Sequence, residues 1–330
     1  MSMVIPENAT KPLVSVIIVS WNAKKYVREC LETLFRTSAG SNLEVILVDN
    51  ASSDGTPDLV AAEFPAVKLI RGRENLGFAR GNNIGIRQST GEYVCLVNSD
   101  IKFLRNCFDP MIEFLRQHPD VGIIGPKMLA ADLRTGRSTM RFPTVWNMLG
   151  RALGLDVLFR NSRFLASYLM TDFDHNSTRD VDILNGWFWM VPRRALDEIG
   201  LLDERFFMYG EDMDWCCRFH HAGKRVVFFA GTEAVHYGGS SSSAAPVRFS
   251  IEQRRADWQF FKKHYRVLDL IALRTMMILH HGLRAAGYGF LSMFKHDKKS
   301  HALLRFQSEM KCLIWFLRPS PAEEKFALQQ

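Results

Sequence analysis

Three short apolar runs in the first third of the chain lack the alternation of polar and apolar side chains that marks a half-exposed strand. They span residues 14–20, 44–49 and 92–97 and are rich in aliphatic residues. Such runs are typical of strands that are buried on both faces of a parallel sheet. This feature constrains the fold most, because parallel neighbours must be joined by a crossover that is usually a helix.

The segments between these runs have the spacing of helices. Apolar residues recur at helical intervals over residues 24–36, and a further helix is expected over 77–88. Pro57 suits the first turn of a helix, and residues 67–71 are expected to form one more short strand. The alternation predicts an α/β fold with a Rossmann-like, mostly parallel sheet flanked by helices.

Polar side chains occupy the positions at which the expected strands end. Ser20 ends the first run, Asp49 ends the second, and Asp100 follows the third. Ligands of open parallel sheets bind outside the carboxyl ends of the strands. We therefore expect a binding site that contains these three residues.

Each of these polar residues has a structural interpretation beside the functional one. A strand-end carboxylate such as Asp100 could bind Mg²⁺ or Mn²⁺, which would bridge diphosphate oxygens, or it could cap a turn. Asp49 and Asn50 could hydrogen-bond a base or a ribose, although both residue types also form Asx turns. His236 follows another apolar segment and is either a metal ligand or a buried core histidine.

Two further segments carry polar groups at expected helix starts. The segment 74–85, rich in Gly and Asn, would place free backbone amides near phosphate, with Arg80 as an assisting cation. Its spacing matches neither the Rossmann fingerprint nor a Walker loop, which argues against hydride transfer and NTP hydrolysis. Glu211 and Asp212 open a later helix, whose dipole would favour the ionised carboxylates and lower their pKa. They could supply a base or simply cap the helix.

Composition narrows the class of partner. The chain has 330 residues and a formal net charge of +7, which permits nucleic acid, anionic lipid or phosphorylated ligands. No recognised motif supports nucleic acid. The six cysteines form no Cys-x-x-Cys pair, which argues against a structural zinc site and for buried free thiols in a reducing, cytoplasmic setting.

No signal peptide or membrane-spanning segment is expected. The N-terminus lacks a basic start followed by an apolar core, and no stretch reaches ~18 uninterrupted apolar residues. Residues 267–318 mix apolar clusters with arginine and histidine. This region could lie in a membrane interface, or it could pack as a helical appendage on the rest of the chain.

Six segments together resemble bacterial family 2 glycosyltransferases with the GT-A fold, and most closely the rhamnosyltransferases of cell-envelope polysaccharides. They are residues 14–22, 48–56, 74–85, 91–100, 200–214 and 235–240. Each segment is weak evidence alone, but together they occur in the family's order.

The resemblance implies an inverting transfer of a sugar from a nucleotide-diphosphate donor, with a divalent cation, Mg²⁺ or Mn²⁺. It assigns metal binding to Asp100 and His236, and catalysis to Glu211 and Asp212, with Asp212 as the base. Asn98 replaces the first acidic residue of the family's Asp-x-Asp-like motif and would reach the donor ribose or sugar. The nucleotide sugar would bind Ser20, Asn22, Asp49, Asn50, Asn75, Gly77, Arg80, Asn82, Asn98 and Ser99.

Two departures from the family pattern stand out. Ser99 stands where Pro or Thr is more usual. Trp187 and Trp189 occupy a segment in which relatives often carry small or aliphatic residues. Wide aromatic rings there would narrow the acceptor pocket or stack on a sugar ring, so we predict that both tryptophans bind the acceptor.

The expected organisation is a GT-A catalytic domain over residues 12–247 and a helical, basic and apolar region over 248–330. Residues 12–125 would form the nucleotide-binding half and residues 126–247 the acceptor and catalytic half. The first candidate reaction moves L-rhamnose from dTDP-rhamnose to a lipid-linked or polysaccharide acceptor, with a UDP-sugar as the other donor class. The enzyme would be cytoplasmic and peripheral on an anionic membrane surface. The alternative is a non-catalytic module that holds a sugar nucleotide or an assembly partner.

Overall fold

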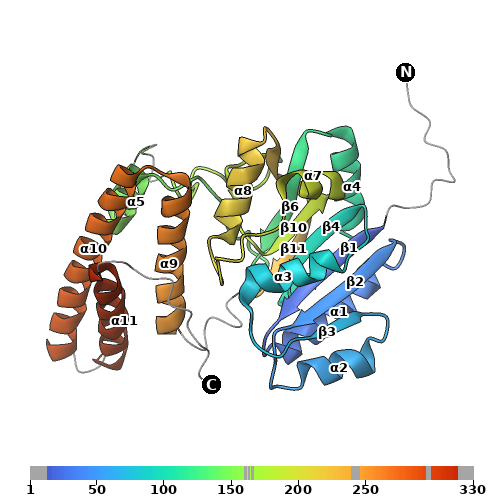
Figure 1. Ribbon diagram of the computed structural model, residues 1–330, viewed down its shortest axis with the longest axis horizontal. Helices are drawn as coiled ribbons and strands as arrows, with labels where there is room; N and C mark the ends of the chain where they lie inside the picture. The colour runs from blue at the N-terminus through green and yellow to red at the C-terminus, as the bar shows by residue number, and fades with distance from the viewer. Residues whose placement is uncertain are drawn as a thin grey trace.

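The computed structural model describes residues 13–159, 162, 164, 167–238, 246–294 and 299–318. Among these residues, nine strands form the main sheet (Figure 1). Eight lie in the order β3 (Lys68–Arg71), β2 (Leu43–Asp49), β1 (Val14–Ser20), β4 (Tyr93–Asn98), β10 (Phe188–Pro192), β6 (Val121–Leu129), β11 (Arg225–His236) and β5 (Ile101–Phe103). The ninth strand, β8 (Arg179–Asp180), pairs with β11.

Strands β1 to β4 are parallel, as the sequence predicts. In the register of β1 with its neighbours, Ser20 lies beside Asp49 and Val19 lies beside Asn98. The carboxyl ends of β1, β2 and β4 therefore meet at one edge of the sheet, where α/β proteins bind their ligands.

Helices cover both faces of this sheet. On one face α1 (Lys24–Thr37), α2 (Thr56–Glu63) and α4 (Phe108–Gln117) pack against a buried cluster that includes Val16 and Ile18. On the other face α3 (Gly77–Arg87), α7 (Arg193–Ile199) and α8 (Glu211–His221) share a core with Ile17. Successive side chains of a strand point to opposite faces, so an unbroken apolar run such as β1 fills both cores.

The second half of the sheet departs from the parallel pattern. Strand β10 is antiparallel to β4 and β6, and β5 is antiparallel to β11. Residues 181–192 form one strand-like run in the sequence. The structure divides this run into β10 and β9 (Ile183–Leu184), which pairs with β7 (Thr139–Met140). Strand β11 crosses an irregularity between Phe229 and Glu233 and continues to His236. No element is predicted over residues 101–129, which form β5, α4 and β6, although Phe108, Met111, Ile112 and Leu115 of α4 have helical spacing.

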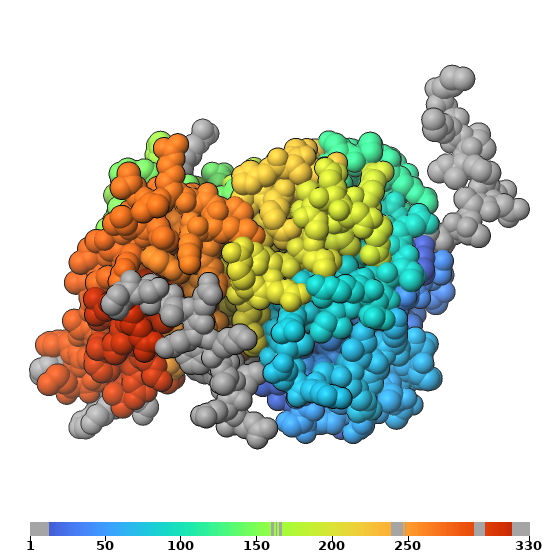
Figure 2. Space-filling view, in the orientation of Figure 1, coloured from blue at the N-terminus to red at the C-terminus, as the bar shows by residue number. Residues whose placement is uncertain are grey.

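Three helices follow the sheet: α9 (Pro246–His264), α10 (Val267–Phe294) and α11 (Lys299–Leu317). They form the end of the molecule away from β2 and β3 (Figures 1 and 2). Helix α5 (Val145–Ala152), followed by α6 (Leu155–Leu158), lies beside α10. Phe260 and Phe316 of the C-terminal helices share a buried core with Trp215 of α8, so these helices pack on the part of the chain that carries the sheet.

Residues 238–245 are rich in Gly and Ser, which predicts a flexible loop. Apart from Gly238 they lie outside the described residues, as do residues 1–12, for which we expect no signal peptide. No described helix combines the length and the apolar character needed to cross a membrane.

Candidate active site

A cavity of about 550 Å³ lies over the carboxyl ends of β1, β4 and β11 and extends to the start of α8. Its volume is typical of a ligand pocket. Most of the predicted site residues line it, namely Asn50, Asn75, Gly77, Asn98, Ser99, Asp100, Trp187, Glu211, Asp212 and His236. The fold thus brings together segments from both halves of the predicted catalytic domain.

Asp100 and His236 face each other in this cavity. Strand β5 pairs with β11 so that Ile101 lies opposite His236, which brings Asp100 beside the last residue of β11. The Asp100 Oδ1 lies 3.2 Å from His236 Nε2, and the Asn98 Nδ2 lies 3.3 Å from the same ring nitrogen. The Trp187 ring stacks on the imidazole, with 5.7 Å between ring centres and 20° between planes, and so holds its orientation.

This pair has the geometry and the chemistry of a partial cation site. Ligand atoms that are neighbours around an octahedral cation with bonds of about 2.1 Å lie about 3.0 Å apart, close to the 3.2 Å between the Asp100 and His236 atoms. Nε2 of His236 contacts both the Asn98 amide and the Asp100 carboxylate, and in the tautomer protonated at Nδ1 it presents its lone pair, the form that binds metal. A carboxylate and an imidazole fit Mn²⁺ or Mg²⁺, with further positions left for diphosphate oxygens and water.

The two carboxyl groups of α8 reach the cavity from the start of that helix. Gly210 precedes them with a φ of 82°, a left-handed conformation that favours glycine. A Cβ at Gly210 would also come within 2.9 Å of the Ala256 Cβ. Asp212 Oδ1 accepts a hydrogen bond from the Met213 N–H at 2.8 Å. Glu211 is 5% exposed, and its Oε2 has no hydrogen-bond partner among the described residues.

Burial has a larger effect than the helix dipole on the pKa values of these two carboxyl groups. Burial raises the pKa of Asp212, although backbone amides hydrogen-bond its carboxylate. Burial, together with the charge of Asp212, raises the pKa of Glu211 well above its usual range. The expectation that the helix start lowers both pKa values is therefore wrong. The amide hydrogen bonds favour ionisation of Asp212, and the Glu211 Oε2 has no such partner among the described residues, so Asp212 loses its proton more readily than Glu211.

The predicted nucleotide-binding residues meet around Gly77. Asn75 Oδ1 accepts a hydrogen bond from the Gly77 N–H at 2.9 Å, and Asn50 Nδ2 donates to the Gly77 carbonyl at 3.0 Å. Gly77 has a φ of +81°, and a Cβ there would lie 2.2 Å from the Phe207 carbonyl oxygen. The position accepts only glycine, and the two asparagines fix this loop against the end of β2.

Ser20 and Asp49 end β1 and β2 beside this loop but do not line the cavity. Asp49 Oδ2 accepts a hydrogen bond from the Ser52 N–H at 2.9 Å. The Ser20 Oγ and the Asp49 Oδ1 are buried and have no hydrogen-bond partner within the described part of the chain. Buried polar atoms of this kind are uncommon, and here they lie next to Asn50, which does line the cavity.

Three other predicted residues also lie outside the lining. Asn22 accepts a hydrogen bond from the loop after β2. Arg80 is exposed and lies 3.6 Å from Glu204, and Asn82 is buried and donates to the Phe78 carbonyl at 2.9 Å. These contacts hold loops and helices in place, and a role in nucleotide binding stays a prediction.

The two tryptophans lie on opposite faces of the sheet. Trp187 lines the cavity, whereas Trp189 is 0% exposed in the core and donates to the Leu184 carbonyl. Residues two apart on a strand would share a face. The Trp187 N–H instead donates to the Asn185 carbonyl at 2.8 Å in a tight turn before β10. The structure therefore does not place Trp189 where it could contact an acceptor; its ring lies behind Gly186 and shapes the wall.

Sequence reasoning missed one wall of the cavity. Gln253, Arg254 and Asp257 of α9 line it, together with Arg151 and Tyr168 from the central part of the chain. The resemblance did not extend beyond residue 250. The available signal was the Arg-x-x-Asp spacing in α9, which puts Arg254 and Asp257 on one helix face with 2.8 Å between their charged atoms.

A model of glycosyl transferase family 2 matches residues 15–200, more than half of the chain. The match includes β1, β4 and Asp100 and ends before α8 and β11, which carry Asp212 and His236. The chain belongs to glycosyl transferase family 2. It is a glycosyltransferase of the hexosyltransferase type, and its sheet with flanking helices is the GT-A fold.

Among similar proteins, one from Mycobacterium tuberculosis is named N-acetylglucosaminyl-diphospho-decaprenol L-rhamnosyltransferase. It is 24% identical to this glycosyltransferase over 290 residues, which cover 82% of this chain and 94% of that protein. The low-salt glycan biosynthesis hexosyltransferase Agl10 of Haloferax volcanii is 26% identical over 226 residues, 67% of this chain and 66% of that one.

A solved structure shares the fold of this glycosyltransferase. It is a mannosyltransferase from Pyrobaculum calidifontis in complex with GDP-Man and Mn²⁺, with a TM-score of 0.54 and 17% identity. The similarity covers 96% of this chain and 91% of the mannosyltransferase.

Proposed function

We propose that this glycosyltransferase moves a sugar from a nucleotide diphosphate to a hydroxyl of a lipid-linked glycan and inverts the anomeric centre. The observation that carries the proposal is the convergence of Asp100, His236 and Asp212 on one cavity. L-Rhamnose from dTDP-rhamnose is the first candidate donor, supported by the name of the mycobacterial relative.

The donor diphosphate would bind at the ends of β4 and β11. Asp100 and His236 would hold a divalent cation, which would neutralise charge on the diphosphate as it leaves. The Mn²⁺ in the related mannosyltransferase structure supports a cation in this fold. Asn98, which contacts His236, would hydrogen-bond the donor ribose or sugar through its side-chain amide. The loop at Gly77 would bind the nucleoside.

Asp212 would act as the general base. Its carboxylate takes the proton of the acceptor hydroxyl while that oxygen bonds to the anomeric carbon and the bond to the diphosphate breaks. Its raised pKa makes it a stronger base than an exposed aspartate. The pKa of Glu211 is raised well above its usual range, so this neighbour would stay protonated and add no second negative charge to the acceptor side.

The wall formed by α9 and α5 would receive the acceptor. Two arginines, Arg151 and Arg254, line this part of the cavity together with Met148 and Tyr168. Arginine binds diphosphate through several parallel hydrogen bonds, and the apolar side chains suit a lipid chain. A lipid diphosphate that carries a sugar would present both features.

Arg151→Gln tests the acceptor wall. The guanidinium of Arg151 lies 5.3 Å from the ring centre of Tyr168 and is exposed, so its loss should leave the fold intact. Loss of a charge-assisted contact should raise the acceptor KM by about 10- to 100-fold, with the donor KM unchanged. Arg116→Gln, at an exposed position of α4 outside the cavity, is the matched control. An unchanged acceptor KM in Arg151→Gln would contradict this placement.

A membrane surface would present such an acceptor. Large apolar side chains are exposed on α5, α6 and α10, which lie at one end of the molecule (Figure 2). They include Trp146, Leu153, Val157, Leu158, Leu268, Ile271, Leu279, Leu283, Phe290 and Met293. The inner face of the cytoplasmic membrane, with its anionic lipids, suits these side chains and the net positive charge of the chain.

Leu279→Glu with Leu283→Glu tests the membrane surface. Both side chains are more than half exposed, at 61% and 67%, so the change should leave the core intact. Losing two inserted leucines and adding two anionic charges should weaken binding to anionic liposomes by roughly tenfold or more in sedimentation. Leu104→Glu with Leu133→Glu, also exposed but outside the C-terminal helices, is the control pair. Equal sedimentation of the two double variants would contradict a role for α10.

The direct test of the proposed reaction is a panel of nucleotide sugars with and without Mn²⁺. A ligand that binds only the folded protein raises its melting temperature, so dTDP-rhamnose should give the largest rise, and only with the cation. Transfer to a polyprenyl-diphosphate sugar should then yield a product with the inverted linkage. Donor binding without any transfer or donor hydrolysis would favour the non-catalytic module instead.

A further inference from the structure

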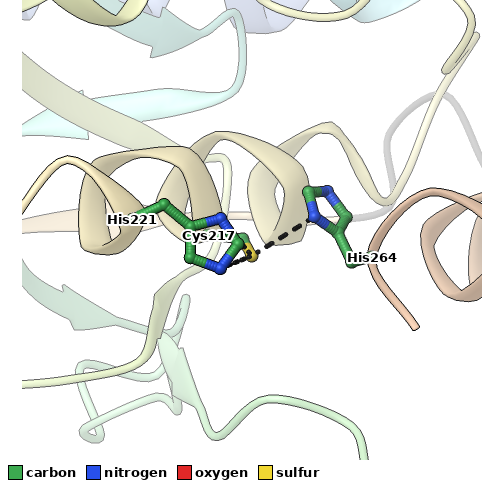
Figure 3. Close-up of side chains that lie close together, drawn as sticks. All are labelled: Cys217, His221 and His264. Carbon is green, nitrogen blue, oxygen red and sulfur yellow. Dashed lines mark hydrogen bonds between the residues drawn. The ribbon is translucent and has the colours of Figure 1, made fainter. Parts of the chain in front are cut away.

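A second cluster of metal-binding side chains lies away from the cavity, where the end of α8 meets the end of α9. Cys217 and His221 are one turn apart on α8, and His264 is the last residue of α9 (Figure 3). The Cys217 Sγ lies 3.5 Å from His264 Nδ1 and 3.9 Å from the ring nitrogens of His221. None of these three residues lines the cavity.

These distances suit three ligands of a single ion. A tetrahedral zinc ion with bonds of about 2.3 Å to sulfur and about 2.0 Å to nitrogen places those two atoms about 3.5 Å apart. Cys217 is buried and holds its position, whereas His221 is exposed. The exposed imidazole can turn toward the ion, and it gives the ion a path from solvent.

Asp214 orients the third ligand. The His264 Nε2 lies 2.7 Å from Asp214 Oδ1, and the Asp214 side chain is fully buried. A carboxylate bound to one ring nitrogen keeps the proton there, so the other nitrogen presents its lone pair to a metal. Here that nitrogen is Nδ1, which faces the sulfur of Cys217. Lys263 and Arg218 also pair with Asp214, so the negative charge that an ion needs must come from the thiolate of Cys217.

We propose that Cys217, His221 and His264 form a zinc site, with water as the fourth ligand. A thiolate with two imidazoles selects Zn²⁺ over Mg²⁺ and Mn²⁺, which prefer oxygen ligands. The sequence argument against zinc considered only paired cysteines. The ligands here are instead a Cys-x-x-x-His pair on one helix and a histidine that the fold brings to it.

The ion would fasten two helices whose other residues build the active site. Asp212 stands at the start of α8, and Arg254 of α9 lines the same cavity. A bond between the far ends of these helices would hold the base at a fixed distance from the acceptor wall.

The test titrates the full-length protein, freed of metal by a chelator, with Co²⁺ and then Zn²⁺. Tetrahedral Co²⁺ bound to a thiolate gives a charge-transfer absorption that Asp100 and His236 cannot produce. We expect one equivalent of Co²⁺ to produce this absorption and one equivalent of Zn²⁺ to remove it. Cys217→Ala and His264→Gln should abolish it. Asp214→Asn should weaken the metal affinity by about 10- to 100-fold, as expected when a partner of a ligand is lost.

Cys216→Ala is the matched control, because the neighbouring thiol faces the Leu184 carbonyl and not the cluster. It should keep the absorption and the rise in melting temperature that Zn²⁺ causes in the unaltered protein. His221→Ala changes an exposed residue and so provides a second variant if Cys217→Ala fails to fold. It should weaken the affinity for Co²⁺ and Zn²⁺ at least tenfold. Absence of the thiolate absorption in the unaltered protein, its persistence in Cys217→Ala, or an unchanged Co²⁺ affinity in His221→Ala would overturn the proposal.

Discussion

Asp212→Asn is expected to lower turnover by about 10²- to 10⁴-fold, the range for loss of a positioned base. Asparagine has nearly the shape of aspartate and can still accept the hydrogen bond from the Met213 N–H, so the start of α8 should not move. Donor affinity should therefore stay unchanged, because the donor site at Asp100 and His236 is intact. Steady-state kinetics gives turnover, and calorimetry with Mn²⁺ gives donor affinity.

The same variant should be more stable than the unaltered protein at neutral pH. Burial raises the pKa of Asp212, so the folded protein holds this proton more tightly than the unfolded chain does. The free energy of unfolding then falls as the pH rises from the ordinary aspartate pKa to the raised pKa of the folded state. Above the raised pKa the protein carries the full destabilisation that comes from burying the ionised carboxylate. The neutral amide of the variant would carry no such cost. Thermal unfolding should show a higher melting temperature for the variant at pH 7 and a smaller difference at pH 4.

Glu211→Gln separates the roles of the two neighbouring carboxyl groups. Because Glu211 holds its proton more tightly than Asp212, the neutral glutamine should reduce turnover by less than about tenfold, far below the effect of removing the base. A loss as large as that of Asp212→Asn would mean that the two groups act as one unit or that Glu211 is the base. Near-normal turnover of Asp212→Asn would remove Asp212 from the role altogether.

The first half of the fold could be predicted because its apolar runs permit a single interpretation. The β1 run can only be buried on both faces, and its parallel pairing brings Ser20 beside Asp49. The pairing of Asp100 with His236 could not be derived from spacing, because it depends on the short strand β5, which aligns Ile101 with His236. The family resemblance supplied what local pattern could not.

Three features needed the folded structure. Strand periodicity predicts that Trp187 and Trp189 lie on the same face of the sheet. The turn at Asn185 instead places them on opposite faces. The pKa of Asp212 depends on how much protein surrounds it, and a sequence shows only that it starts a helix. The contribution of Arg254 to the cavity depends on how α9 packs on α8. Each of these is a consequence of tertiary packing that overrides a local rule.

Asp100→Asn is expected to remove the increase in donor affinity that Mn²⁺ provides. It should also lower turnover on the order of 10³-fold, because a bound cation stabilises the charge on a leaving diphosphate by several kcal/mol. The amide keeps the size of the carboxylate and can still contact His236 Nε2, so β4, β5 and β11 should stay in register. Calorimetry of nucleotide-sugar binding at several Mn²⁺ concentrations measures the effect. In the unaltered protein affinity should increase with Mn²⁺, and in the variant it should not.

Asp58→Asn is the matched control, because this exposed carboxylate on α2 pairs with Arg71 and does not line the cavity. It should bind the donor and respond to Mn²⁺ as the unaltered protein does. His236→Asn should reproduce the effect of Asp100→Asn, and the double variant should lose little more, because residues that hold one ion act as a unit. Equal Mn²⁺ dependence in the unaltered protein and Asp100→Asn would show that the cation binds elsewhere. Additive losses in the double variant would show that the two side chains do not hold the same ion.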